Sequence, residues 1–186
     1  CRELGVEIEF VDGITEGFPR VEAIRETEGR TFVHPFEGPK TALGTATIGL
    51  EFIDQTRQAG VTLDAVIVAA GGGGLTVGVA CAVKQMSPTT KVYVVEPEGA
   101  ASLTAAMAAG TPVQVALDHT LADGLAVPQI GTLPFEILPR VVDRLVTVDE
   151  AAIALAVLRL IELEKSVVEG AGATPLAAFL AGKLTH

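Results

Sequence analysis

Apolar residues along the chain follow two periods, one typical of buried strands and the other of helices. Runs of small and β-branched apolar residues predict three strands, at 65–70, 91–95 and 141–148. Helical spacing predicts helices at 41–59, 74–86, 99–109, 133–138, from the segment after 148 to 163, and after 170. This alternation predicts an α/β fold, in which helices cover both faces of a mostly parallel sheet.

The predicted helix 41–59 carries residues that indicate how it packs. Its apolar residues Ile48, Phe52 and Ile53 are expected to face inward. Gly44 and Gly49 indicate that another element approaches it closely, because glycine has no side chain to separate two backbones.

The predicted helix that ends near 163 carries signals for its start and its burial. Thr147 and Glu150, three residues apart, have the spacing of a capping box. The apolar residues that follow are so dense that we expect this helix to be largely buried. The stretch from 110 to 124 is the longest irregular segment, and such segments commonly carry function.

The first part of the chain is more polar and is expected to form a separate structural unit. The alternation at 6–10 predicts a half-exposed strand, and a brief second strand is expected at 31–33. Between them, Phe18, Val21 and Ile24 mark one face of a short helix that ends before Gly29. The boundary of this unit is expected near Gly38-Pro39.

Composition excludes several classes of function. The 186 residues include 13 Lys and Arg against 23 Asp and Glu, so the net charge of -10 argues against a nucleic-acid partner. Glycines interrupt the uncharged run at 65–83, which argues against a membrane span. The two cysteines, Cys1 and Cys81, have no metal or redox spacing, which indicates a reducing, cytoplasmic location. The three histidines, at 34, 119 and 186, show no ligand spacing.

Four consecutive glycines, Gly71 to Gly74, follow the predicted strand 65–70 and precede a predicted helix. Glycines allow a ligand to approach the backbone N–H groups, and a helix start adds unpaired donors and the positive end of the helix dipole. The stretch therefore predicts an anion site, most often for phosphate. A glycine hinge that only turns the chain is the alternative.

The spacing around the glycines separates three kinds of phosphate site. Leu75, Thr76 and Val77 stand where a P-loop needs Lys and then Ser or Thr, which disfavours nucleotide hydrolysis. The dinucleotide fingerprint needs a glycine at its sixth position, where Thr76 or Val77 stands instead. Glu96 nonetheless lies where such a site holds a ribose, so a dinucleotide-binding oxidoreductase domain remains an alternative. The third kind cradles one phosphate monoester.

The stretch Gly71-Gly72-Gly73-Gly74-Leu75 resembles the phosphate loop of the fold type II pyridoxal-phosphate enzymes, specifically the threonine/serine dehydratase and serine racemase group. Further stretches resemble the same group in the same order, and together they cover essentially the whole chain. They are Phe32-Val33-His34-Pro35-Phe36, Gly44-Thr45-Ala46-Thr47-Ile48-Gly49-Leu50-Glu51, Val95-Glu96-Pro97, Thr120-Leu121-Ala122-Asp123-Gly124 and Val168-Glu169-Gly170-Ala171-Gly172.

The resemblance implies a tryptophan synthase β-like fold and a pyridoxal 5'-phosphate site. Gly71 to Gly74 and Leu75 match the residues that hold the phosphate. Gly124 matches a residue beside the cofactor ring, and Glu169 matches an acid near the far side of the ring. From the residues alone, Asp123-Gly124 is also compatible with an ordinary turn, and Glu169 with a helix cap.

The resemblance also implies a divalent cation site in some relatives. Glu96 matches its first acid and Ala100 its carbonyl ligand, but Ser102 stands in place of the second acid. A hard cation needs several oxygen ligands, so the match is incomplete.

The reaction implied is elimination of ammonia from a hydroxy amino acid, or racemisation, which starts in the same way. The resemblance places the Schiff-base lysine before Cys1, so no catalytic residue is predicted here, and this chain alone is expected to be inactive. The five lysines present are expected on the surface. Residues 1–38 are expected to end a small domain, and 39–186 to form much of a larger cofactor-binding domain of a homo-oligomer. A catalytically inactive assembly subunit with the same fold is a further alternative.

Overall fold

The computed structural model describes residues 1–184, except for the side chains of residues 14 and 15, so His186 lies outside it. The chain divides into two compact units, Cys1–His34 and Pro35–His186. The boundary falls slightly before the one expected near Gly38-Pro39. None of the described helices has both the length and the apolar character that crossing a membrane requires.

The first unit contains the short 3-10 helix η1 (Arg2–Leu4) and the helix α1 (Ile14–Glu28), which Gly29 ends in a left-handed conformation. The predicted helix is therefore confirmed. The strands predicted at 6–10 and 31–33 are wrong: both segments are irregular, and neither finds a partner in the one sheet of the described residues. A strand needs a neighbour for its backbone hydrogen bonds, and alternation alone cannot supply one.

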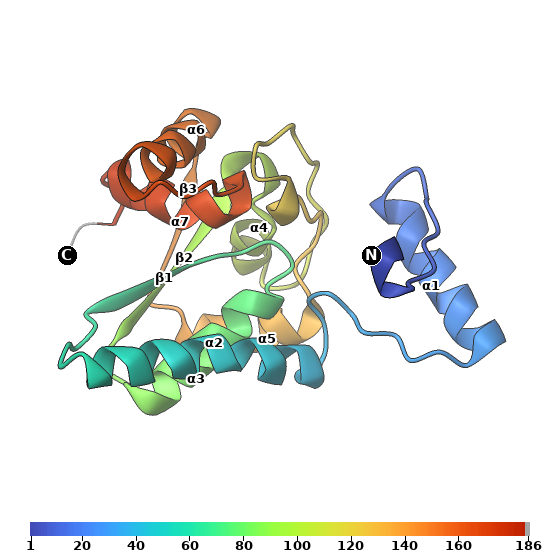
Figure 1. Ribbon diagram of the computed structural model, residues 1–186, viewed down its shortest axis with the longest axis horizontal. Helices are drawn as coiled ribbons and strands as arrows, with labels where there is room; N and C mark the ends of the chain where they lie inside the picture. The colour runs from blue at the N-terminus through green and yellow to red at the C-terminus, as the bar shows by residue number, and fades with distance from the viewer. Residues whose placement is uncertain (185–186) are drawn as a thin grey trace. The chain divides into compact units, whose positions relative to one another are not determined.

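The second unit alternates helices and strands in the predicted order (Figure 1). Its helices and strands are α2 (Pro39–Gln58), β1 (Ala65–Ala69), α3 (Gly74–Met86), β2 (Lys91–Pro97), α4 (Ser102–Ala109), α5 (Thr132–Val141), β3 (Arg144–Val148), α6 (Glu150–Arg159) and α7 (Gly170–Leu180). Two 3-10 turns, η2 (Glu98–Ala100) and η3 (Asp123–Leu125), and the π-helical turn η4 (Leu160–Glu164) complete it.

The three strands form a parallel sheet in the order β1-β2-β3, in which Val68 lies beside Val94 and Val94 beside Leu145. Alternate side chains enter two cores: Val68 and Val94 pack with α3, α4 and α5, whereas Ala69 and Val95 pack with α6 and α7. Figure 1 shows α3 and α5 on the opposite side of the strands from α6 and α7. The predicted α/β fold is confirmed.

The helix α2 packs against α3 through glycine. A Cβ atom on Gly49 would lie 2.8 Å from Ala82 Cβ, so the prediction of a close approach is confirmed there. It is wrong at Gly44, which has no heavy atom within 4 Å of the Cβ position. Ile53 is buried as predicted, but Ile48 and Phe52 are 40% and 44% exposed, because α2 lies at the outside of its layer and covers α3 with one narrow face.

The start of α6 differs from the predicted capping box. Asp149 is the N-cap, and its Oδ1 accepts a hydrogen bond from the Ala152 N–H over 2.8 Å. Glu150 instead points away, toward Leu121. The expected burial is also wrong: Ile153 and Ala156 are buried, but Leu155 and Leu158 are more than 40% exposed. Only one face of α6 meets the sheet and α7.

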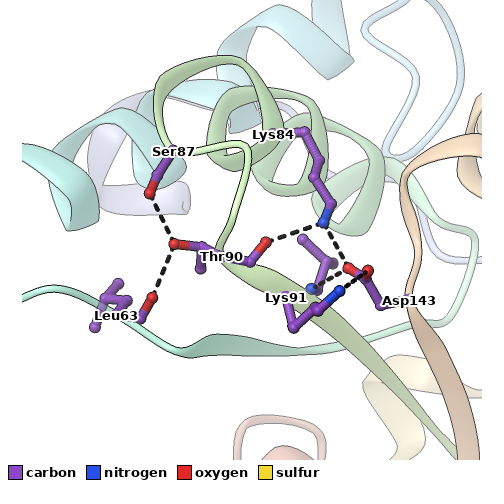
Figure 2. Close-up of polar contacts among 7 residues, drawn as sticks. Leu63, Lys84, Ser87, Thr90, Lys91 and Asp143 are labelled. Carbon is purple, nitrogen blue, oxygen red and sulfur yellow. Dashed lines mark hydrogen bonds and ion pairs between the residues drawn. The ribbon is translucent and has the colours of Figure 1, made fainter.

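Charged residues form a cluster at the edge where the strands begin (Figure 2). Asp143 accepts hydrogen bonds from Lys84 Nζ over 2.6 Å, from the Val92 N–H over 2.8 Å and from Lys91 Nζ over 3.3 Å. Desolvation raises the pKa of Asp143, but these hydrogen bonds outweigh it, and the pKa lies below its ordinary value. Lys84, only 23% exposed in its side chain, is thus a structural partner and not the surface group that was expected.

Candidate functional site

The glycine loop joins β1 to α3 at the opposite edge, where the strands end. The packing around it leaves no room for side chains. A Cβ on Gly72 would lie 2.2 Å from the Phe36 ring, and a Cβ on Gly74 would lie 2.5 Å from Phe36 Cα. Gly73, at φ +88°, would meet Pro134 Cβ at 2.6 Å. The glycines thus bring the loop backbone into contact with two other segments.

The loop leaves its N–H groups available. The first intrahelical donor of α3 is the Val77 N–H, which bonds to the Gly73 carbonyl over 2.9 Å. Among the described residues, none accepts a hydrogen bond from the N–H groups of Gly71 to Leu75. A helix start leaves its first N–H groups without intrahelical partners, and buried backbone donors in proteins are nearly always paired. Gly71 to Gly74 are buried, so their unpaired donors call for an acceptor, whereas Leu75 is exposed. They fit a phosphate group.

Glu37 supports the loop from outside. Its carboxylate accepts hydrogen bonds from the N–H groups of Thr132 and Leu133, over 2.6 and 3.0 Å, at the start of α5. The Gly131 N–H, just before α5, donates to the Gly72 carbonyl over 3.0 Å. Sequence reasoning missed Glu37, because the residues that it binds lie 95 and 96 positions farther along the chain.

The structure brings the other predicted segments to the glycine loop. A Cβ on Gly71 would lie 3.0 Å from Leu125 Cα, in the turn η3 that contains Gly124. A Cβ on Gly124 would lie 3.3 Å from Ala171 Cβ and 3.7 Å from Glu169 Oε1. Three segments that are distant in sequence therefore meet at one end of the sheet.

The local alternatives for Asp123-Gly124 and Glu169 can be compared with these contacts. Asp123 Oδ1 accepts a hydrogen bond from the Gly124 N–H over 2.9 Å, as in a simple turn. Glu169 occupies the N-cap position of α7, but its side chain makes no capping hydrogen bond there. Its Oε1 instead lies near Gly124.

Glu96 is fully buried at the end of β2 and serves a structural purpose. Its Oε1 accepts a hydrogen bond from the Leu103 N–H over 2.6 Å. Its Oε2 accepts hydrogen bonds from Thr104, over 2.8 Å from the N–H and 2.7 Å from Oγ1. Desolvation raises the pKa of Glu96, against these lowering hydrogen bonds. Because both oxygens accept hydrogen bonds from the first turn of α4, the carboxylate caps this helix and is not available to a ligand.

The predicted cation ligands gain no partner from the structure. Ala100 is buried in η2, and Ser102 Oγ is buried without a hydrogen bond. Within residues 1–184, no group of three or more His, Cys, Asp or Glu side chains could hold a metal ion. With Glu96 committed to α4, the residues present do not fit a divalent cation well.

Known proteins resemble the chain over nearly its whole length. It is 42% identical over 182 residues to a phenylserine dehydratase of Ralstonia pickettii, covering 98% of this chain and 55% of that protein. It is 41% identical to an L-threonine ammonia-lyase of Thermotoga maritima, covering 96% and 44%. The fold matches the structure of maize serine racemase with a TM-score of 0.88 and 33% identity, covering 96% and 53%.

The chain spans about half the length of the curated relatives it matches. Residues 1–186 match one family over their full extent, described as "Pyridoxal-phosphate dependent enzyme". The five free N–H groups, the convergence of three segments at the glycine loop and the parallel sheet agree with this match. The chain therefore belongs to the family of pyridoxal-phosphate dependent enzymes.

Proposed function

We propose that the protein containing this chain is a pyridoxal-phosphate dependent lyase that eliminates ammonia from a hydroxy amino acid. The observation that carries the proposal is the set of five N–H groups, from Gly71 to Leu75, that no described residue accepts. The names of the relatives, phenylserine dehydratase and L-threonine ammonia-lyase, support a β-hydroxy amino acid as the substrate and a 2-oxo acid and ammonia as products.

Different residues of the site would hold different parts of the coenzyme. Gly71 to Gly74 and Leu75 would hold its phosphate, Gly124 would lie beside its ring, and Glu169 would lie near the far side of the ring. When bound, pyridoxal phosphate supplies an electron sink for the electrons that remain when the substrate α-proton leaves. The lysine that removes this proton is proposed to lie outside residues 1–186.

The wider organisation of the protein is also a proposal. Residues 1–38 end a small domain and residues 39–186 belong to a larger coenzyme-binding domain. A cytoplasmic homo-oligomer is supported by two free cysteines and by the exposed apolar side chains of α6. Sedimentation of the intact protein as a monomer would refute the oligomer.

The alternatives have less support. The acid expected to hold the ribose of a dinucleotide is Glu96, and both of its oxygens bind α4. The same commitment, with Ser102 in place of a second acid, weighs against a divalent cation at Glu96 and Ala100. Saturable binding of NAD to the intact protein would revive the dinucleotide alternative. An inactive assembly subunit requires that the intact protein lack a reactive lysine.

Borohydride reduction of the intact protein with pyridoxal phosphate tests the proposed function. We expect the coenzyme to be fixed covalently to one lysine peptide, identified by mass spectrometry, and L-threonine or L-serine to give a 2-oxo acid and ammonia. Protein reduced before the coenzyme is added serves as the control. Absence of a labelled peptide would overturn the proposal, and formation of D-serine without ammonia would assign a racemase instead.

A further inference from the structure

Glu150 connects α6 to the loop beside the candidate coenzyme site. It is the first residue of α6, yet the cap of that helix is supplied by Asp149. The carboxylate of Glu150 is therefore not needed as the cap. Its Oε2 accepts a hydrogen bond from the Leu121 N–H over 2.7 Å, across 29 positions of sequence.

Apart from its buried neighbours Thr120 and Ala122, little in the loop holds Leu121 in place. The loop follows the long irregular stretch from 111, so no strand ladder fixes its backbone. The Leu121 side chain is 49% exposed, so apolar packing anchors it only weakly. Its carbonyl rests against the bare Cα of Gly170, where a Cβ would lie 2.1 Å from the oxygen. The hydrogen bond from Leu121 to a charged acceptor is thus the directional contact that fixes this backbone.

The position of Leu121 determines where Gly124 lies. Two residues separate them, and the turn that contains Gly124 closes with a hydrogen bond from the Leu125 N–H to the Ala122 carbonyl over 2.8 Å. Gly124 in turn lies over Ala171 and Glu169, and Leu125 lies against Gly71. A shift at Leu121 would therefore reach both the ring side and the phosphate side of the site.

The second oxygen of Glu150 indicates that the residue is not placed there for stability alone. Glu150 Oε1 is buried, and no described residue donates a hydrogen bond to it. Burying half of a carboxylate without a partner costs free energy. A residue selected only to stabilise the start of α6 would not carry this cost.

We propose that Glu150 is a positioning residue, which holds the loop Leu121–Gly124 against the start of α7 and thereby shapes the side of the coenzyme site that Gly124 forms. The inference rests on the proposed function for its consequence, because Gly124 matters to the coenzyme only if the coenzyme binds there. The hydrogen bond itself does not depend on that function.

The test compares three variants of the intact protein. Glu150→Ala removes the acceptor, Glu150→Gln keeps an oxygen that can accept from Leu121, and Asp149→Ala removes the cap of the same helix without touching the loop. Amide hydrogen exchange is followed without coenzyme in peptides that span 117–125. Coenzyme affinity and the absorption spectrum of the bound coenzyme are then measured.

We expect Glu150→Ala to accelerate exchange in the loop about tenfold or more, the range for a lost hydrogen bond to a charged group. We expect the same variant to weaken coenzyme binding and change the coenzyme spectrum, and Glu150→Gln to restore most of each. Asp149→Ala should lower the melting temperature while loop exchange stays as in the wild type.

Wild-type loop exchange in Glu150→Ala would overturn the proposal, as would identical effects of Asp149→Ala on the loop. Faster exchange with an unchanged coenzyme affinity and spectrum would overturn its link to the site. A wild-type protein that binds no coenzyme would instead refute the proposed function, and the exchange data would still decide whether Glu150 holds the loop.

Discussion

The two ends of the parallel sheet use polar groups in opposite ways. Where the strands begin, Asp143 meets Lys84, Lys91 and the Val92 N–H, so charges of opposite sign are paired within the chain (Figure 2). Where the strands end, the loop from Gly71 carries no charge, and its N–H groups have no acceptor among the described residues. The polar groups at the first end are paired within the chain, whereas the N–H groups at the second end are open to the proposed ligand.

The difference teaches how to separate structural polar groups from functional ones in this fold. A charged residue with every partner present, such as Lys84, contributes to stability and not to a site. Unpaired donors held rigidly by other segments indicate recognition, because folding leaves them unsatisfied. A charged residue at the strand ends does not by itself identify the site either, because both oxygens of Glu96 accept hydrogen bonds from the first turn of α4.

The largest effect is expected from adding a methyl group to the loop. In Gly74→Ala the new Cβ would lie 2.5 Å from Phe36 Cα, so backbone must move. Such overpacking costs about 1–3 kcal/mol. Because the N–H groups move with the backbone, we also expect coenzyme affinity to fall at least tenfold. Thermal unfolding and coenzyme titration of the intact protein measure the two losses.

Gly44→Ala is the matched control for this substitution. Gly44 lies within α2, is exposed, and has no heavy atom within 4 Å of its Cβ position. An alanine there should raise the free energy of unfolding by about 0.5–1 kcal/mol and leave coenzyme affinity unchanged. Equal coenzyme affinity in Gly74→Ala and Gly44→Ala would contradict the assignment of the glycine loop as the phosphate site.

At the other end of the sheet we expect an effect on stability alone, without the loss of coenzyme affinity. Asp143→Ala leaves the buried Val92 N–H without its side-chain acceptor and Lys84 without its counter-ion, which should cost about 1–3 kcal/mol at neutral pH. Lys91→Ala should cost less than about 1 kcal/mol, because Lys91 is more exposed and lies farther from Asp143. Urea unfolding gives both values. A loss of coenzyme affinity in Asp143→Ala would contradict the claim that this end of the sheet contributes to stability and not to coenzyme binding.

Sequence reasoning succeeded where the signal is local. Buried apolar runs predicted the three strands, and four glycines between strand and helix located the loop, because period and glycine content act within a few residues. It failed where a residue's partner lies far along the chain. Nothing near Glu150 indicates that it bonds to Leu121 and not to its own helix, and nothing near Lys84 indicates Asp143, 59 positions away.

Exposure was mispredicted for a related reason. The apolar residues of α2 and α6 are dense enough for burial, yet Ile48, Phe52 and Leu158 are exposed, because the width of the covered face depends on which elements pack there. The predicted strand at 6–10 failed in the same way. Its alternation is a property of the segment, but pairing requires a neighbour that the described residues do not provide.

The partly exposed carboxylate of Asp143 and the fully buried carboxylate of Glu96 should give the ends of the sheet opposite responses to pH. The pKa of Asp143 is lowered, so its contribution to stability is present above the ordinary value of about 3.9 and is lost as pH falls through the lower folded-state pKa. The pKa of Glu96 is raised by burial, so its contribution is fully present below about 4.3 and is lost as pH rises through the folded-state pKa.

Urea unfolding from pH 7 to pH 3 tests this sign difference, with Asp143→Asn and Glu96→Gln each compared with the wild type. The stability advantage of the wild type over Asp143→Asn should hold from pH 7 to about pH 5 and shrink below about pH 4. Its advantage over Glu96→Gln should instead grow as pH falls toward about 4. Two differences that change in the same direction would contradict the distinction between a carboxylate paired with lysines and a buried carboxylate that only caps α4.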